Sequence, residues 1–204
     1  MRPGVIIGAE GRRRLVAGAA GMARILAPTL GPKPRTVLVG PVISVREPEV
    51  LDHGATIARR VYELGDRTEN LGAMLVRHVA LRMFERVGDG TATAAVLAAH
   101  LLAEADRLLA AGLPAREIGD GVRRAGGQAA AALAGAAWQL GTRAGLAAFV
   151  AGILPEPGPA AIVAEVVDSL PEDGAILIED SAAAETSHEY VDGMRWDGGW
   201  LPPF

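Results

Sequence analysis

The stretch ERVGDGTATAAVL, residues 85–97, joins two segments of opposite character. Gly88 and Gly90 flank the lone carboxylate of Asp89, and the chain then becomes a run of alanine, valine and leucine. The run predicts a helix over about residues 91–111. A helix that begins at a glycine turn exposes backbone N–H groups at its positive end, so an anion such as phosphate is the natural ligand there.

The side chains of this loop suit a phosphate that carries a metal ion. Thr91 and Thr93 add hydroxyl donors. Asp89 would repel a phosphate, but magnesium between the two would bind both, because it prefers one or two carboxylates together with phosphate oxygens. An ordinary turn with a helix N-cap explains the same residues. The loop matches neither the Walker nor the dinucleotide-binding pattern, so both interpretations stay open.

A second glycine turn, PTLGPKP at residues 28–34, lies at the edge of another predicted helix. That helix spans residues 10–27, and its apolar side chains recur at helical spacing at Leu15, Ala19, Met22 and Leu26. The Gly31-Pro32 pair predicts a turn with exposed backbone groups beside Lys33. A plain turn that ends the helix is the alternative interpretation.

Apolar periodicity predicts further helices over about residues 70–86 and 113–133, and another that begins near Pro159. Gly112 is expected to end the helix that starts at Thr91. The apolar face of the helix over 70–86 is expected to consist of Leu71, Leu75, Val79 and Met83.

Short strands are expected at residues 36–39, 42–45 and 175–179, the last with the sequence AILIE. The pattern leaves residues 50–63 ambiguous. The predicted fold class is therefore mainly α with small β elements, an α+β chain.

The composition excludes several functional classes. Of 204 residues, 50% are apolar and only 4% aromatic, which predicts a core of closely packed helices with small side chains. The net charge of −4 argues against nucleic acid as a partner. There is no cysteine, no apolar run long enough to span a membrane and no signal-peptide pattern, so a cytoplasmic protein without membrane partners is expected.

The two loops, in this order and separation, resemble the ATP-binding loops of the group I chaperonin family, the GroEL type. Residues 29–34 stand where that family has TLGPKG, and residues 88–93 where it has GDGTTT. Further segments similar to that family follow the same order: ENLGAMLVRHVA (69–80), AAGLPAREIGDGVRRA (110–125), EDGAILIED (172–180) and VDGMRWDGGWLPPF (191–204). Several collinear matches are more specific than either loop alone.

The resemblance implies a chaperonin-like helical domain and a domain order. Residues 1–130 would form the N-terminal part of an equatorial ATP-binding domain, 131–190 the first half of an intermediate hinge domain, and 191–204 the start of a truncated apical domain. The implied partners are a homo- or hetero-oligomeric chaperonin ring, with unfolded client proteins and a co-chaperonin binding only through the missing apical domain.

The resemblance also implies ATP and Mg²⁺ as cofactors. The residues implied to bind them are Thr29, Leu30, Gly31, Pro32, Asp89, Gly90, Thr91, Ala92 and Thr93, with Asp89 as the metal ligand. No catalytic residue is assigned within the chain. His78, His100 and His188 show no metal-ligand spacing and are interpreted as structural or surface residues, and Trp196 and Trp200 as packing at the hinge–apical junction.

Three positions depart from the family pattern. Pro34 replaces the last glycine of the first loop, and Ala92 replaces a threonine in the second. His53 stands where the family's KDG segment has an aspartate that works close to the metal and the attacking water. Imidazole is a poor magnesium ligand, although Asp52 would supply a carboxylate if the alignment shifted by one residue.

Three functions are compatible with these observations. The first is an ATP-dependent protein-folding chaperonin subunit, truncated or a fragment, with little ATPase activity alone because the family's hinge aspartate is absent from these residues. The second is a non-catalytic chaperonin-like assembly or regulatory subunit with degraded nucleotide binding. The third is an unrelated helical scaffold with chance loops.

Overall fold

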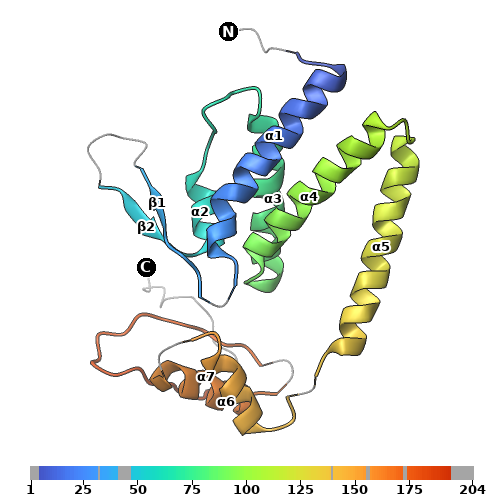
Figure 1. Ribbon diagram of the computed structural model, residues 1–204. Helices are drawn as coiled ribbons and strands as arrows, with labels where there is room; N and C mark the ends of the chain where they lie inside the picture. Colours follow the sequence, from blue (N-terminus) through green and yellow to red (C-terminus); the bar gives the residue numbers. More distant parts are fainter. Residues whose placement is uncertain are drawn as a thin grey trace, which may run out of the picture. The chain divides into compact units, whose positions relative to one another are not determined.

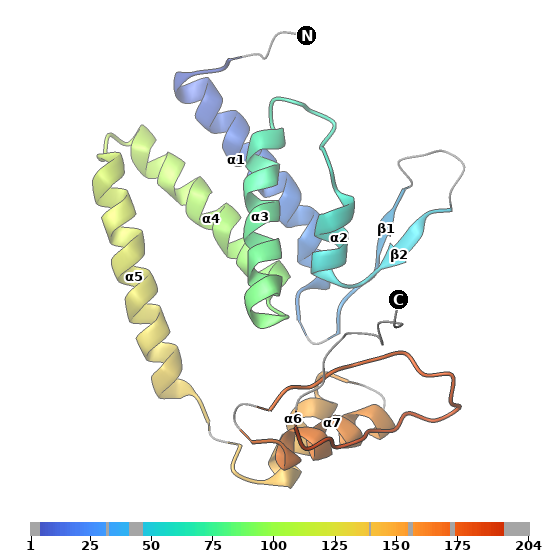
Figure 2. The same ribbon diagram turned by 180° about the vertical axis from the view of Figure 1, so that it is seen from behind.

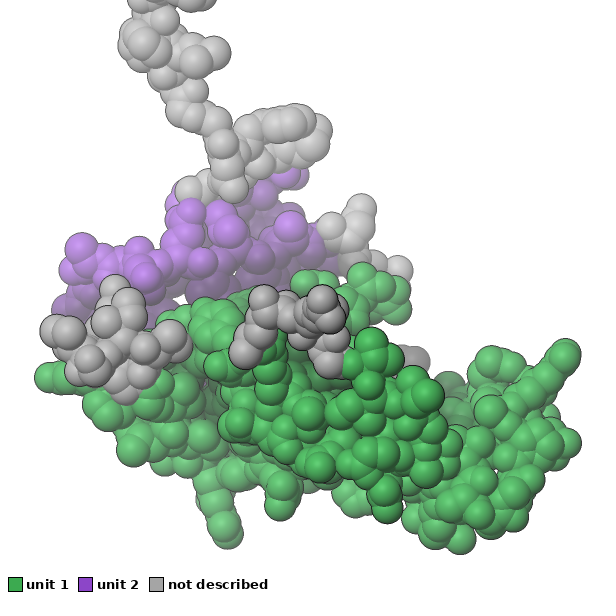
Figure 3. Space-filling view, turned by 90° about the horizontal axis from the view of Figure 1, so that it is seen from above, with its two compact units in different colours: residues 1–137 green, residues 138–204 purple. Residues whose placement is uncertain are grey.

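The computed structural model describes residues 5–31, 33–40, 47–138, 140–154, 157–171 and 174–193. The chain divides into two compact units, Met1–Ala137 and Trp138–Phe204 (Figure 3). It is mostly helical with a two-stranded sheet, so the expected α+β class is confirmed. Among the helices in the described ranges, none is both long and apolar enough to cross a membrane.

Three long helices form the body of the first unit: α1 (Gly8–Leu26), α3 (Asn70–Val87) and α4 (Thr91–Ala110). Each packs against the other two, and the short helix α2 (Gly54–Arg60) lies beside α3 (Figures 1 and 2). A 3₁₀ turn, η1 (Ala27–Thr29), follows α1 directly, because the proline at position 28 is tolerated only in a first turn. The helices predicted at 10–27, 70–86 and 91–111 are confirmed.

The sheet is a small antiparallel pair. Strand β1 (Val37–Val39) confirms the strand expected at 36–39, and it pairs with β2 (Glu49–Leu51) so that Val37 lies opposite Leu51. The partner strand therefore overlaps the start of residues 50–63, the range whose pattern was ambiguous. The strand expected at 42–45 lies outside the described residues.

The core consists largely of small side chains, as the composition predicted. Its buried members are Ala19, Met22, Ala23, Leu26, Ile57, Ala58, Ala73, Val76, Ala80, Ala95 and Ala99. Met22, Leu26, Ile57 and Val76 are the largest fully buried side chains. The predicted apolar face of α1 is thus largely correct, and alanines on α3 and α4 complete the packing.

The apolar face predicted for α3 is wrong. Leu71, Leu75 and Val79 remain 65%, 45% and 39% exposed. The buried face of α3 lies beside that stripe and consists of smaller residues, Gly72, Ala73, Val76 and Ala80. Helices approach more closely through small residues, so α3 packs its alanine and glycine face against α1 and leaves the leucine stripe outside.

Glycines on both helices make the crossing of α1 and α3 unusually close. A Cβ atom added to Gly18 would lie 1.8 Å from the carbonyl oxygen of Glu69, and one added to Gly72 would lie 1.8 Å from that of Leu15. Backbone thus meets backbone on both sides of the crossing. Any larger residue at either position must push the helices apart.

We expect Gly72→Ala to destabilise the chain by about 3 kcal/mol, the upper part of the usual cost of overpacking, because the obstacle is a backbone carbonyl. Urea unfolding followed by circular dichroism measures the loss. Gly126→Ala in α5 is the matched control, since nothing lies within 4 Å of its added Cβ. Equal stability of the two variants would show that the close crossing is absent in solution.

Ion pairs tie α1 to the segment that precedes α3. The Arg14 guanidinium lies 2.8 Å from Glu10 and 3.0 Å from Asp66. Hydrogen bonds from the hydroxyl and backbone N–H of Thr68 lower the pKa of Asp66, and hydrogen bonds from Arg14 and Arg13 lower the pKa of Glu10. Both carboxylates are therefore better stabilised as anions in the folded chain than in the unfolded one.

We expect Asp66→Asn to lower the urea midpoint at pH 7, and the difference from the unmodified chain to shrink as the pH falls below about 4 and to vanish below the lowered folded-state pKa of Asp66. A carboxylate with a lowered folded-state pKa stabilises the fold above its unfolded-state pKa. That contribution is lost as the pH falls through the folded-state value. Glu104→Gln, whose ion pair with Arg107 stays within one helix, is the control. A difference that stays undiminished between pH 7 and pH 3 would contradict a charge effect.

Helix α4 ends where the sequence predicted. Gly112 has φ +92°, its N–H donates to Leu109, and the N–H of Leu113 donates to Leu108. This is the double hydrogen bond of a Schellman motif, which a left-handed glycine permits.

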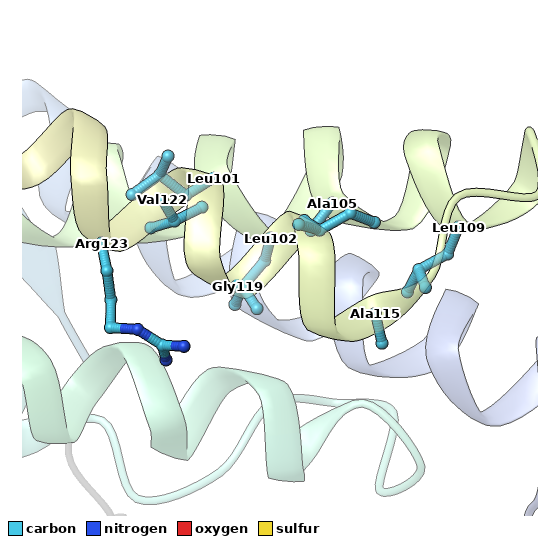
Figure 4. A pocket seen from close by; sticks show the side chains of 9 residues that line it. Leu101, Leu102, Ala105, Leu109, Ala115, Gly119, Val122 and Arg123 are labelled. Carbon is cyan, nitrogen blue, oxygen red and sulfur yellow. The ribbon is translucent and has the colours of Figure 1, made fainter.

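Helix α5 (Ala115–Ala136) follows, and none of its 22 residues is buried. It diverges from α4 after the turn (Figures 1 and 2). Between them lies an apolar groove of about 410 Å³, lined by Leu101, Leu102, Ala105 and Leu109 of α4 and by Ala115, Ile118, Gly119, Val122 and Arg123 of α5 (Figure 4).

The second unit contains α6 (Arg143–Ala151) and α7 (Pro157–Ser169), which pack together. Helix α7 begins close to the predicted Pro159, whereas α6 was not predicted, because its composition of alanine and glycine carries little periodicity. The strand expected at 175–179 is wrong: residues 174–180 form no strand. A strand needs a neighbour for its backbone groups, and no described segment supplies one.

Candidate functional site

Two glycines shape the turn between α3 and α4. Gly88, at φ +81°, caps α3 by donating its N–H to the carbonyl oxygen of Phe84 at 2.8 Å, and Gly90, at φ +76°, precedes α4. Both conformations are left-handed, which side chains disfavour. The sequence places its most flexible residues against a strong helix because only glycine turns the chain this sharply.

The first turn of α4 leaves backbone donors without partners. Gly90 has no side chain to cap the helix, and the first intrahelical bond runs from Ala94 N–H to Gly90 C=O at 2.9 Å. Within the described part of the chain, the N–H groups of Thr91, Ala92 and Thr93 have no hydrogen-bond acceptor. This end of the helix therefore offers three donors and the positive pole of the dipole.

Asp89 is exposed at the tip of the turn. One of its oxygens, Oδ1, accepts a hydrogen bond from the N–H of Gly90 at 2.6 Å, which folds the carboxylate back over the loop. No group of three or more metal-binding side chains exists among the residues described. A cation at Asp89 would therefore take the rest of its oxygen ligands from water or from a bound anion.

The loop after α1 is held by its own hydrogen bonds. The Thr29 hydroxyl donates to Leu26 C=O at 2.8 Å, and Arg35 N–H donates to Pro28 C=O at 3.0 Å. Gly31 has φ +99° and is exposed, with nothing within 4 Å of the place a Cβ would occupy. The loop thus presents open backbone at Gly31, as the sequence predicted.

The two loops meet at a third segment. Gly54, the buried first residue of α2, has a Cβ position 2.5 Å from the Thr91 hydroxyl and 3.2 Å from the Thr29 hydroxyl. Thr29 and Thr91, which are 62 residues apart, therefore lie on either side of one small space that only glycine leaves open. Sequence reasoning missed Gly54 and considered its neighbour His53 instead. The missed signal was a glycine at a helix start.

His53 points toward α3. Its ring packs edge-on against Phe84 at 5.3 Å between centroids, and the Arg59 guanidinium lies 5.1 Å from the centre of the same Phe84 ring. The backbone carbonyl of Phe84 accepts the hydrogen bond from Gly88 that caps α3. The ring contact of His53 with Phe84 therefore links the segment before α2 to the glycine turn. Asp52, the alternative carboxylate, is exposed.

The remaining predicted site residues are distributed as follows. Leu30 and Thr93 are exposed, Gly90 is half-buried, and Thr91 is only 5% exposed. Ala92 is buried, and its methyl group belongs to the core. Its backbone N–H is therefore the only group that it could offer to a ligand. Pro32 lies outside the described residues, as do Trp196 and Trp200. His78, His100 and His188 are exposed.

These features define a helical domain in which two glycine turns meet beside a helix N-terminus whose backbone donors are unpaired. Comparison with known proteins identifies the family: the sequence pattern of the TCP-1/cpn60 chaperonin family matches residues 22–152. A protein named "Chaperonin GroEL 2" from Cereibacter sphaeroides is 36% identical over 203 residues, and a second of that name from the same species is 35% identical over 202. The chain belongs to this chaperonin family, as the resemblance indicated.

The chain is much shorter than these relatives. Each alignment covers 98% of this chain but only 36% of the relative, so the chain spans about a third of their length.

A double-mutant cycle tests the meeting of the loops. We expect Gly54→Ala to cost about 1–3 kcal/mol of stability, because its methyl group would lie 2.5 Å from the Thr91 hydroxyl. Thr91→Ala in the same chain removes that hydroxyl and should recover part of the loss, as urea unfolding of the four variants would measure. Strictly additive losses would contradict the contact.

Proposed function

We propose that the chain is the ATP-binding part of a chaperonin subunit, with Mg-ATP held at the meeting of its two glycine loops. The observation that carries this proposal is the packing at Gly54, where a Cβ would lie 2.5 Å from the Thr91 hydroxyl and 3.2 Å from the Thr29 hydroxyl, so that the two loops are brought together. Two loops far apart in sequence come together there beside a helix N-terminus. That arrangement suits a polyphosphate.

The donor set fits the nucleotide. The unpaired N–H groups of Thr91 to Thr93 would bind phosphate oxygens, together with exposed backbone near Gly31. Asp89 would hold Mg²⁺ through the oxygen that Gly90 leaves unused. A bound magnesium ion would supply charge neutralisation for the phosphates. Leu30 and Pro32 would complete the first loop around them.

We further propose the domain order implied by the resemblance: 1–130 equatorial, 131–190 the first half of the hinge, and 191–204 the start of an apical domain. The division at Ala137 supports a boundary near 130. A chaperonin ring, unfolded client proteins and a co-chaperonin are the proposed partners. The client proteins and the co-chaperonin would bind an apical domain, which would lie in the part of the longer relatives that this chain does not cover. The cysteine-free composition supports a cytoplasmic location.

A second function is favoured by one observation. His53 occupies the position of the family's carboxylate, and its ring is committed to Phe84. Pro34 and Ala92 each remove a further polar group from the loops. These residues favour a non-catalytic chaperonin-like subunit with degraded nucleotide binding, acting in assembly or regulation.

Titration of the whole chain with Mg-ATP, followed by calorimetry, tests the binding proposal. We expect Asp89→Ala to weaken binding by roughly tenfold or more, since it removes the proposed protein ligand of the cation. Asp168→Ala, an exposed aspartate on α7, is the matched control. Removal of magnesium with a chelator should weaken binding by the unmodified chain to a similar degree.

Two results distinguish the alternatives. Magnesium-dependent binding that Asp89→Ala abolishes would support the ATP-dependent subunit. Absent binding, or binding that is indifferent to Asp89 and to magnesium, would contradict the proposed site and support the non-catalytic subunit with degraded nucleotide binding.

A further inference from the structure

Helix α2 brings Gly54 to the candidate site, but it is too short to be stable by itself. Isolated helices of fewer than about 12 residues are marginal in water, and α2 has seven. Its position therefore depends on the helices against which it packs, chiefly α3. Any contact that fixes α2 on α3 also fixes Gly54 relative to the hydroxyl groups of Thr29 and Thr91.

Arg77, in the middle of α3, binds the C-terminal end of α2 through its guanidinium group. Its Nε donates to the carbonyl oxygen of Ala58 at 2.7 Å, and its Nη2 lies 3.5 Å from the carbonyl oxygen of Arg59. The last carbonyl groups of a helix have no partner within it, and no described backbone N–H donates to these two. A guanidinium there satisfies them and places a positive charge at the negative end of the helix dipole.

The Arg77 side chain is half-buried and makes no ion pair with the described residues, since no carboxylate oxygen among them lies within 4.0 Å of its guanidinium. Other arginines of the first unit are paired with carboxylates, such as Arg12 with Asp106. The polar contacts of Arg77 are therefore directed to the backbone of α2. A hydrogen bond from a charged donor is roughly twice as strong as one between neutral groups.

The other end of α2 is held against the same helix. His53, which precedes Gly54, packs its ring against Phe84 of α3, and the Arg59 guanidinium lies over the same Phe84 ring. Arg77 and Phe84 are seven residues, or two helical turns, apart, so they lie on one side of α3. Helix α3 thus contacts α2 at both of its ends, by a ring at the first and by a guanidinium at the last.

We propose that Arg77 is a positioning residue for the nucleotide site, which keeps Gly54 between the two glycine loops by holding the end of α2. The guanidinium binds α2 at Ala58, four residues or about 6 Å along the helix from Gly54, so it acts through α2 and not on the nucleotide. Without it, α2 would unwind from its last turn, and the loops would lose the segment that brings them together. This role rests on the proposed Mg-ATP site.

Calorimetric titration of the full chain with Mg-ATP, combined with amide hydrogen exchange, tests this role. We expect Arg77→Gln to weaken binding by roughly tenfold, and Arg77→Lys, which keeps the charge and a donor, to fall between that variant and the unmodified chain. The amides of Ile57 and Val61, which are hydrogen-bonded within α2, should exchange roughly tenfold faster in Arg77→Gln. The amides of α1 should keep their rates, because only α2 is released.

The matched control is Arg116→Gln, which removes an exposed arginine of α5 and should change neither the affinity nor the exchange of α2. Unchanged binding by Arg77→Gln, or exchange that rises as much in α1 as in α2, would overturn the positioning role and leave the proposed function intact. If the unmodified chain itself does not bind Mg-ATP, the proposed function is overturned, and the role of Arg77 with it.

Discussion

The backbone contact between α1 and α3 is the constraint on which the first unit depends. Gly18 and Gly72 each place a bare Cα against a carbonyl oxygen of the other helix. This reciprocal contact is possible only because neither residue has a side chain, and it brings the two helices closer than leucine or valine would allow. The alanines around it then fill the remaining space, so a core with almost no aromatic side chains is still densely packed.

The same crossing positions the candidate site. Helices α1 and α3 both end at the same edge of the helical layer (Figures 1 and 2), so the turns that follow them are neighbours although they are far apart in sequence. Helix α2 adds Gly54 between their threonines, and His53 fastens that segment to the last turn of α3. The candidate site is thus formed by helix ends whose positions are fixed by the packed core. The loops themselves make few contacts.

Local patterns predicted the long helices and both glycine turns but not the short helices α2 and α6, because helix periodicity, proline and left-handed glycine act through residues close in sequence. They did not predict which face of α3 is buried. Leu71 and Leu75 are the more apolar residues, but Gly72 and Ala73 allow closer packing, and only the partner helix decides between the two. The strand predicted for the AILIE run was wrong for a related reason. A strand depends on pairing with a neighbouring strand, and no local rule supplies that neighbour.

Within the site, the sequence predicted Thr29, Gly31 and the 88–93 turn, because each belongs to a recognisable loop. Gly54 could not be predicted in the same way. Its role follows from what approaches it in space, the hydroxyl groups of Thr29 and Thr91, and its place at the start of a helix was the one local signal of that role.

Helix α5 has a mechanical consequence. It follows the Gly112 turn and extends for about 33 Å with no side chain buried. Alanines in its second half favour the helix by intrinsic propensity, whereas Gly126, Gly127 and Gly135 weaken it. Such a helix would act as a lever: a rotation of about 5° at the turn would displace its far end, at Ala136, by about 3 Å.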